Sequence, residues 1–138
     1  MAPKFDEWEG DKYSGSSCRG AINGWANMGV CEESYWEYKA SKPGTLSLAA
    51  AKNARSNTIG AYYRIRPRIA DFHTALNEAG VIFCSANVHS GWSREQVKSG
   101  TIPFAADQTG GHAFSLIGYT KKGFWVQNSW GENWGNGG

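Results

Sequence analysis

The feature that most constrains the fold is a predicted β-hairpin close to the C-terminal end of the sequence. Residues 112–120 predict one strand, Lys121-Lys122-Gly123 predicts a tight turn, and residues 124–130 predict the returning strand. Antiparallel strands around a short turn bring their distant ends together. We therefore expect His112, which opens the first strand, to lie beside Asn128, near the end of the second.

A histidine beside an amide is a pair with chemical use. The carbonyl oxygen of Asn128 can accept a hydrogen bond from one ring N–H of His112, which fixes the tautomer and the orientation of the ring. The other ring nitrogen then faces a nucleophile as a base, or pairs with a thiolate as an imidazolium. Taken singly, a histidine in a strand and an asparagine near a turn are more often structural.

Glycine and tryptophan residues surround the expected pair. Gly110 and Gly111 directly precede the histidine and would let a substrate backbone approach closely, although a Gly-Gly pair alone is usually only a turn. We expect Trp130 and Trp134 to cover the pair and exclude water, which strengthens its hydrogen bonds. The combination is more informative than any of its parts.

In order and spacing, these motifs resemble those of the papain family of cysteine peptidases. The match consists of Gly110-Gly111-His112-Ala113, Gly118-Tyr119, Asn128-Ser129-Trp130-Gly131 and Trp134-Gly135. It is tight over roughly the last 30 residues, and the remainder fits loosely but in order. Residues 29–38 are similar to the family's helix-end segment, with Trp-Glu-Tyr in place of Tyr-Pro-Tyr, and residues 80–83 to its Gly-Pro-Val strand, with the proline absent.

The resemblance implies an α+β, papain-like cysteine peptidase fold with a helical part and an antiparallel sheet part. Residues 1–138 would form a single peptidase domain, and we expect it to be incomplete at the N-terminus and also at the C-terminus. His112 would be the catalytic base or imidazolium, and Asn128 would orient it. The implied substrate-binding residues, for a peptide or protein substrate, are Gly15, Ser16, Gly111 and Trp130, of which Trp130 would also shield the catalytic pair.

The family's nucleophile has no counterpart in this sequence. It lies in a Gln…Cys-Gly-Ser-Cys-Trp type of segment, about 130 to 150 residues before the histidine. Counting back from His112 passes Met1, so we expect the nucleophile in an upstream segment of the same domain. Cys18, at a predicted helix N-terminus beside Arg19, has a setting that favours a thiolate. Its spacing to His112 is far too short for the family, which favours a structural thiol.

Two functions therefore remain open. The first is a cysteine peptidase that hydrolyses peptide bonds through a thiolate–imidazolium pair. The alternative is a non-catalytic papain-like module that binds peptide or glycan in a tryptophan-lined cleft. Binding alone requires neither His112 nor Asn128, so the pair favours the peptidase.

Composition and cysteine spacing argue against several other classes of function. A net charge of +2 over 138 residues is too small to indicate a nucleic-acid or anionic membrane partner, and no apolar stretch is long enough to span a bilayer. Cys18, Cys31 and Cys84 show neither a CxxC pair nor metal-like spacing with histidine, so we expect no metal or cofactor. Their disulfide state stays open. Residues 1–7 lack the apolar region of a secretory signal, which leaves the compartment open for an expected fragment.

Local patterns predict the remaining elements. Ser16 or Ser17 offers an N-cap and Gly29 a stop for one helix, and Gly80 ends another that begins at Pro67. Alternation of Ile59, Ala61, Tyr63 and Ile65 has period two and predicts a strand. The predicted elements are helices over residues 17–28, 46–55 and 67–79, strands over 58–66 and 81–88 (the latter of the buried type), and mostly loop over 90–109.

Overall fold

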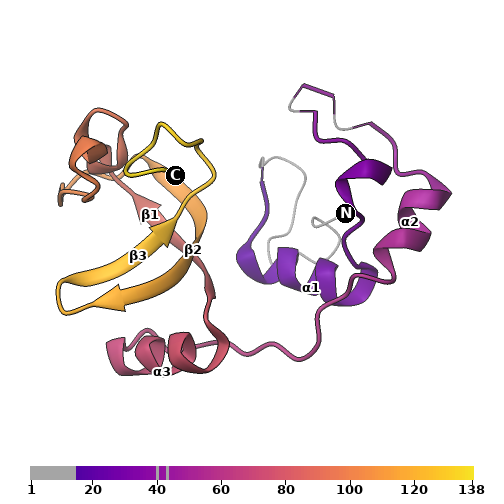
Figure 1. The fold of residues 1–138 in the computed structure, drawn as a ribbon, viewed down its shortest axis with the longest axis horizontal. Coiled ribbons are helices and arrows are strands. Elements are labelled where there is room, and N and C mark those ends of the chain that lie inside the picture. Colours follow the sequence, from indigo (N-terminus) through magenta and orange to yellow (C-terminus); the bar gives the residue numbers. More distant parts are fainter. Residues whose placement is uncertain (1–14, 40, 43) are drawn as a thin grey trace. The chain divides into compact units, whose positions relative to one another are not determined.

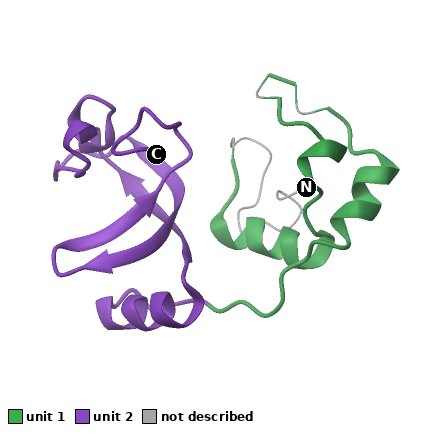
Figure 2. Cartoon of the chain, in the orientation of Figure 1, with its two compact units in different colours: residues 1–63 green, residues 64–138 purple. Residues whose placement is uncertain are grey.

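The computed structural model describes residues 15–39, 41–42 and 44–138, and the chain divides into two compact units, residues 1–63 and 64–138 (Figure 2). The first unit contains helices, and the second combines a helix with an antiparallel sheet. Together they confirm the predicted α+β class. The elements of the first unit are α1 (Cys18–Met28), η2 (Glu33–Tyr35) and α2 (Leu48–Ala54); those of the second are α3 (Ile69–Ala79), β1 (Ile82–Val88), η3 (Ser90–Trp92), η4 (Gln96–Ser99), β2 (Gly110–Thr120) and β3 (Gly123–Gln127).

The two helices of the first unit begin at serine caps. The Ser17 side chain accepts a hydrogen bond from the Gly20 N–H at 2.9 Å, and Ser47 does the same for the Ala50 N–H at 3.1 Å. At the other end of α1, Gly29 adopts a φ of 78°. A Cβ on Gly29 would lie 1.7 Å from the carbonyl oxygen of Ala54, so only glycine allows this part of the chain to approach the end of α2.

Polar and backbone contacts connect the described elements of the first unit. The Trp25 indole N–H donates to the carbonyl oxygen of Asn57 at 2.9 Å, and the Glu32 N–H donates to Asn53 Oδ1 at 2.9 Å. Among the residues described there, only Ala50 and Ala54 are buried hydrophobics. Exposed large side chains include Trp25, Val30, Tyr35, Tyr38, Leu48, Tyr62 and Tyr63.

The sheet of the second unit has the strand order β1-β2-β3, with both pairs antiparallel (Figure 1). Ile82 lies opposite Leu116, and Ala86 lies opposite His112. The hairpin of β2 and β3 contains a β-bulge between Leu116 and Gly118, where the exposed Ile117 is the extra residue. The predicted hairpin is thus confirmed, although β3 ends at Gln127 and the residues from Asn128 to Trp130 lie beyond it.

Helix α3 covers one face of this sheet, as Figure 1 shows. It ends at Gly80, which has a left-handed φ of 78° and donates its N–H to the carbonyl oxygen of Leu76 at 2.9 Å. Leu76 packs with Ile82 and Leu116 in a buried cluster. Nearer the turn, the ring of His73 stacks on that of Tyr119 at 3.8 Å. This packing holds the hairpin in place.

A second buried cluster lies against the loop that follows β1. It joins Val88, Trp92, Val97 and Trp134, and Phe114 and Val126 of the sheet pack against it. The Trp134 indole N–H donates to the carbonyl oxygen of Trp92 at 2.8 Å in a buried setting. The Gly-rich tail is therefore attached to the loop after β1.

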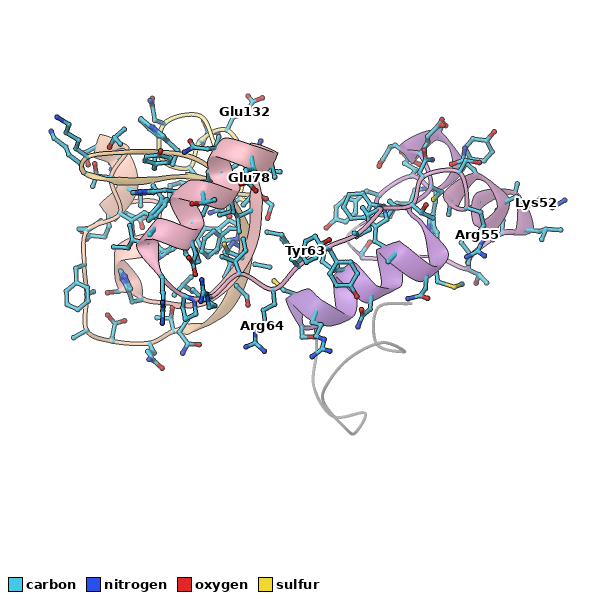
Figure 3. The ribbon with its side chains drawn as sticks, turned by 90° about the horizontal axis from the view of Figure 1, so that it is seen from below. Lys52, Arg55, Tyr63, Arg64, Glu78 and Glu132 are labelled. Atoms are coloured by element: carbon cyan, nitrogen blue, oxygen red, sulfur yellow. The ribbon has the colours of Figure 1, made fainter. Side chains whose placement is uncertain are left out.

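Two expectations about strands are wrong. Residues 58–66 form no strand, because their alternating side chains have no partner strand with which the backbone can pair. Tyr63 and Arg64 lie on this extended segment, where the first unit ends and the second begins (Figure 3). Strand β1 is only partly buried, since Phe83 is 42% exposed on the face that α3 does not cover. No helix among the described residues is long and apolar enough to cross a membrane.

Candidate active site

The side chains of His112 and Asn128 meet at the end of the hairpin, as predicted. His112 is the third residue of β2, and Asn128 is the first residue after β3. The distance between His112 Nε2 and Asn128 Oδ1 is 2.7 Å. The hairpin brings both residues to the same end of the sheet, which explains why the contact was predictable from the local sequence.

The neighbouring backbone determines which atoms donate in this contact. Asn128 Oδ1 also accepts a hydrogen bond from the Ser129 N–H at 2.8 Å, and a backbone N–H can only donate. The shared atom must therefore be the amide oxygen, so His112 Nε2 carries the proton that it donates. The other nitrogen, Nδ1, is left as the acceptor in the neutral ring, or as a second donor in the imidazolium.

Asn128 has one unsatisfied group. Its Nδ2 is buried and has no hydrogen-bond partner among the described residues. A buried donor without an acceptor costs on the order of 1–3 kcal/mol. The amide is thus held in its position by the bonds of its oxygen, at some expense of stability.

Two tryptophan rings lie against His112. The Trp130 ring lies 4.5 Å from the His112 ring at an angle of 37°, and Trp130 is itself 38% exposed. Trp92 and Trp134 are buried, and the Trp92 ring meets His112 edge-on at 6.2 Å. We call Trp92, Trp130 and Trp134 the tryptophan cluster. The sequence indicated Trp130 and Trp134, but not Trp92, which lies in a loop without any periodic pattern.

The backbone just before His112 is open. Gly110 has a φ of 155°, and a Cβ built on either Gly110 or Gly111 would meet nothing within 4 Å. Gly111 lies opposite Asn87 at the end of the β1–β2 pair. This geometry leaves room for a substrate backbone, while the predicted substrate-binding role of Gly111 stays a prediction.

Gly15 and Ser16 belong to the first unit, where both are exposed and directly precede the cap of α1. Gly15 has a φ of 114°, and Ser16 Oγ donates to the carbonyl oxygen of Ser17 at 3.4 Å. These features are local to the start of α1. The predicted substrate-binding role of both residues therefore stays a prediction.

In the part of the chain that the structure describes, none of the three cysteines forms a disulfide. Cys18 is the first residue of α1 in the first unit, and Cys31 follows the end of the same helix. Cys84 lies in β1 and packs against the cluster of Leu76, Ile82 and Leu116. Packing of this kind is typical of a structural thiol. In the described part of the chain, no group of three or more histidine, cysteine or carboxylate side chains is placed to hold a metal ion.

A carboxylate fixes the loop that carries Trp92. Asp107 accepts hydrogen bonds from Ser90 Oγ at 2.8 Å and from the Ser90 N–H at 3.1 Å. These bonds, the side-chain one foremost, hold the pKa of Asp107 below its ordinary value, with a smaller contribution from the charge of His89. The loop after β1 is thereby joined to the irregular segment that leads into β2.

A family model described as papain family cysteine protease matches residues 9–138. The chain belongs to the papain family of cysteine proteases. Macrodontain-1 from Ananas macrodontes is 28% identical to it over 114 residues, which are 82% of this chain and 52% of macrodontain-1. Xylellain, a cysteine protease from Xylella fastidiosa, has a solved structure that matches with a TM-score of 0.78 and 26% identity.

The xylellain match covers 91% of this chain and 54% of the xylellain chain, and it confirms the expected papain-like fold. This papain-family chain thus spans about half the length of the relatives that it matches. The motifs around His112 and Asn128 are those on which the family resemblance rested. The family assignment gives the contact between these two side chains a chemical interpretation.

Proposed function

We propose that this chain supplies the base and its orienting amide to a cysteine peptidase site that hydrolyses peptide bonds. The observation that carries the proposal is the 2.7 Å contact between His112 Nε2 and Asn128 Oδ1. Because this contact occupies Nε2, the nitrogen available to a nucleophile is Nδ1. A thiol beside Nδ1 would lose its proton to the ring and form a thiolate–imidazolium pair.

His112 then transfers a proton in each of the two catalytic steps: it donates one in the first and accepts one in the second. The thiolate attacks the carbonyl carbon of the peptide bond, and the imidazolium donates its Nδ1 proton to the amine that leaves. Water next attacks the acyl carbon while neutral His112 accepts a proton from that water; the C–S bond then breaks, which releases the acid product and restores the thiolate–imidazolium pair. Asn128 keeps the ring oriented through both steps. The tryptophan cluster keeps water away from the Nε2–H bond, which strengthens it.

The nucleophile in this proposal comes from a segment upstream of the present chain. The spacing of about 130 to 150 residues between the family's cysteine and histidine favours this origin over any of the cysteines in the chain. The packing of Cys84 against a core cluster favours a structural role for it. We therefore treat the upstream segment as the missing partner of His112.

The direct test is a chain completed on its N-terminal side with a papain-family segment that carries the nucleophilic cysteine. Hydrolysis of a fluorogenic peptide is expected to fall to background in His112→Ala. A smaller loss is expected in Asn128→Ala, because orientation is only part of what the histidine contributes. Trp125→Ala, which removes a 52% exposed ring of β3 that belongs to neither core cluster, is the control and should retain activity. Equal and negligible losses in the first two variants would reject the proposal.

The rival nucleophile, Cys18, is tested on the chain by itself. We expect no thiol-dependent hydrolysis, because His112 is then a base without a nucleophile. Cys18 should react with iodoacetamide no faster than an ordinary exposed thiol at any pH between about 5 and about 9. Mass spectrometry of the alkylated peptide gives the rate. Fast labelling at the acid end, lost in His112→Ala, would make Cys18 the nucleophile.

The alternative is a non-catalytic module that holds peptide or glycan against tryptophan. One observation favours it: Trp130 is 38% exposed directly beside His112. In that case the completed chain would bind a peptide or glycan in a manner that depends on Trp130, and it would not hydrolyse peptide bonds. Fluorescence titration of the completed chain and its Trp130→Ala variant separates the two functions.

A further inference from the structure

The backbone of residues 58–65 forms no regular structure and no hydrogen bond to other backbone groups of the described chain. Such bonds reach the segment only at its two ends. The carbonyl oxygen of Asn57 accepts the Val30 N–H at 3.1 Å, and that of Arg66 accepts the Arg68 N–H at 2.7 Å. The N–H and C=O groups between these ends are therefore open to another protein.

Most side chains of the segment are also exposed. Residues 60–64 are all exposed, and Tyr63 is 85% exposed. Figure 3 shows the Arg64 side chain pointing away from the ribbon. Ile65 differs, because it is half-buried and packs against the cluster that contains Leu76. The exposed stretch thus ends where the core of the second unit begins.

An exposed, extended backbone is the form in which peptidases accept their substrates, because the substrate pairs with the enzyme as an added strand. A bond within a helix or strand is cut only after local unfolding. The two units are contiguous in the sequence, so one backbone segment connects them in this chain. A cut in that segment would break no helix, strand or core cluster of the described residues.

The arginines of the chain differ in how open the bonds that follow them are. The six arginines are Arg19, Arg55, Arg64, Arg66, Arg68 and Arg94. Arg19 lies within α1, and Arg55 is the C-cap of α2. Arg94 lies in a turn, where the Gln96 N–H donates to the carbonyl oxygen of Ser93 at 3.0 Å. A peptidase would have to unfold each of these three sites first.

The two arginines that follow Arg64 are protected by other means. The bond after Arg66 leads into Pro67, which has no N–H and a fixed φ, and the Arg66 guanidinium is paired with Asp71 at 2.8 Å. Arg68 is the N-cap of α3, and its carbonyl oxygen accepts a helical N–H at 3.1 Å. Of the six arginines, Arg64 alone is followed by a bond without such protection.

We propose that the Arg64–Ile65 peptide bond is a site of limited proteolysis by a peptidase selective for arginine, one with an acidic pocket for the guanidinium. Water is the co-reactant: the C–N bond breaks, Arg64 gains a carboxylate and Ile65 gains an amino group. The cut separates the backbone of the first unit from that of the second, which carries the His112–Asn128 pair. This role goes beyond the proposed function and does not depend on it.

The test treats the 138-residue chain with a small amount of an arginine-selective endopeptidase and follows the fragments by mass spectrometry. The first products should be residues 1–64 and 65–138. The bond after Arg64 should be cut at least about tenfold faster than the bond after any other arginine, because only the other bonds require local unfolding. In urea, several arginine bonds should be cut at similar rates, because the selectivity belongs to the fold.

Arg64→Lys is the matched variant, because it keeps the positive charge on an exposed side chain. The arginine-selective enzyme should leave its bond to Ile65 intact. A lysine-selective endopeptidase should then cut after position 64, which it leaves intact in the unchanged chain. Amide spectra of β2 and β3 show that the variant is folded. This exchange of enzymes separates the openness of the position from the identity of its side chain.

A first cut after any other arginine of the folded chain would overturn the proposal. So would an intact Arg64–Ile65 bond under conditions in which the unfolded chain is cut there, or the same selectivity in urea, which would show a preference for local sequence. Because the peptidase is added from outside, none of these outcomes depends on hydrolysis by the chain itself. A failure here is thus distinct from a failure of the proposed function.

Discussion

The two compact units differ in what holds them together. Among the described residues, the second unit has the buried hydrophobic side chains Leu76, Ile82, Val88, Trp92, Val97, Leu116 and Trp134, whereas the first has only Ala50 and Ala54. The first unit relies instead on helix caps, on the close approach at Gly29, and on hydrogen bonds from Trp25 and Glu32. Apolar burial stabilises the second unit, while backbone geometry and polar contacts connect the described part of the first.

The difference bears on function. The predicted catalytic pair and its tryptophan cover lie entirely in the unit with the larger core. Catalytic side chains require fixed geometry, and a well-packed surrounding provides it. The predicted substrate-binding residues Gly15 and Ser16 lie directly before the cap of α1 in the first unit, whose described part has few buried hydrophobic side chains. Substitutions of equal size should therefore have unequal effects in the two units.

The largest expected effect is the loss of a core side chain in the second unit. Leu116→Ala should lower the free energy of unfolding by about 2–5 kcal/mol, because a buried leucine leaves a cavity. In the first unit, Leu48→Ala should change it by no more than about 0.5 kcal/mol, since Leu48 is 72% exposed. Hydrogen exchange, read separately for amides of β2 and α2, measures both. A similar loss of stability in the two variants would show that the two units do not differ in this respect.

Backbone geometry gives the next largest effect, this time in the first unit. Gly29→Ala should destabilise that unit by at least about 1–3 kcal/mol, because its φ of 78° strains any other residue. The added Cβ would also meet the carbonyl oxygen of Ala54. Gly60→Ala is the control, since no atom lies within 4 Å of the added Cβ. Exchange at the α1 amides should rise in the first variant only; equal behaviour would mean that the close approach is dispensable.

The smallest expected effect is the protonation of Asp107 at low pH. The carboxylate of Asp107 is stabilised by Ser90, so its folded pKa is lowered. Its contribution to the loop is present at neutral pH and is lost as the pH falls through that lowered folded pKa, below the ordinary value of about 3.9. The Ser90 amide signal should move in this range in the unchanged chain and stay constant in Asp107→Asn. NMR titration measures the change, and a titrating signal in the variant would contradict it.

The sequence predicted those parts of the molecule that local chemistry determines. Ser17 and Gly29 mark the ends of α1, and Gly80 marks the end of α3, because caps act within one turn of a helix. The contact of His112 with Asn128 was predictable because a short hairpin brings both residues together. Each of these inferences needed only neighbouring residues.

Contacts between distant segments were not predictable in this way. The alternation in residues 58–66 is that of a strand, but a strand also needs a partner, and the sequence does not show whether one is near. The contact of Trp92 with His112 joins a loop after β1 to the start of β2. Neither periodicity nor a motif marks Trp92, so only the three-dimensional structure reveals it.

The β-bulge in the hairpin has a consequence for how related sequences are aligned. Ile117 is exposed and stands outside the ladder, with Leu116 paired to Val126 before it and Gly118 paired to Trp125 after it. Deleting Ile117 would leave a regular ladder in which Tyr119 still faces His73. A one-residue deletion between His112 and Leu116 would shift the register of β2, so that side chains on one side of the deletion would point to the opposite face of the sheet. A single-residue gap in this strand therefore belongs at position 117.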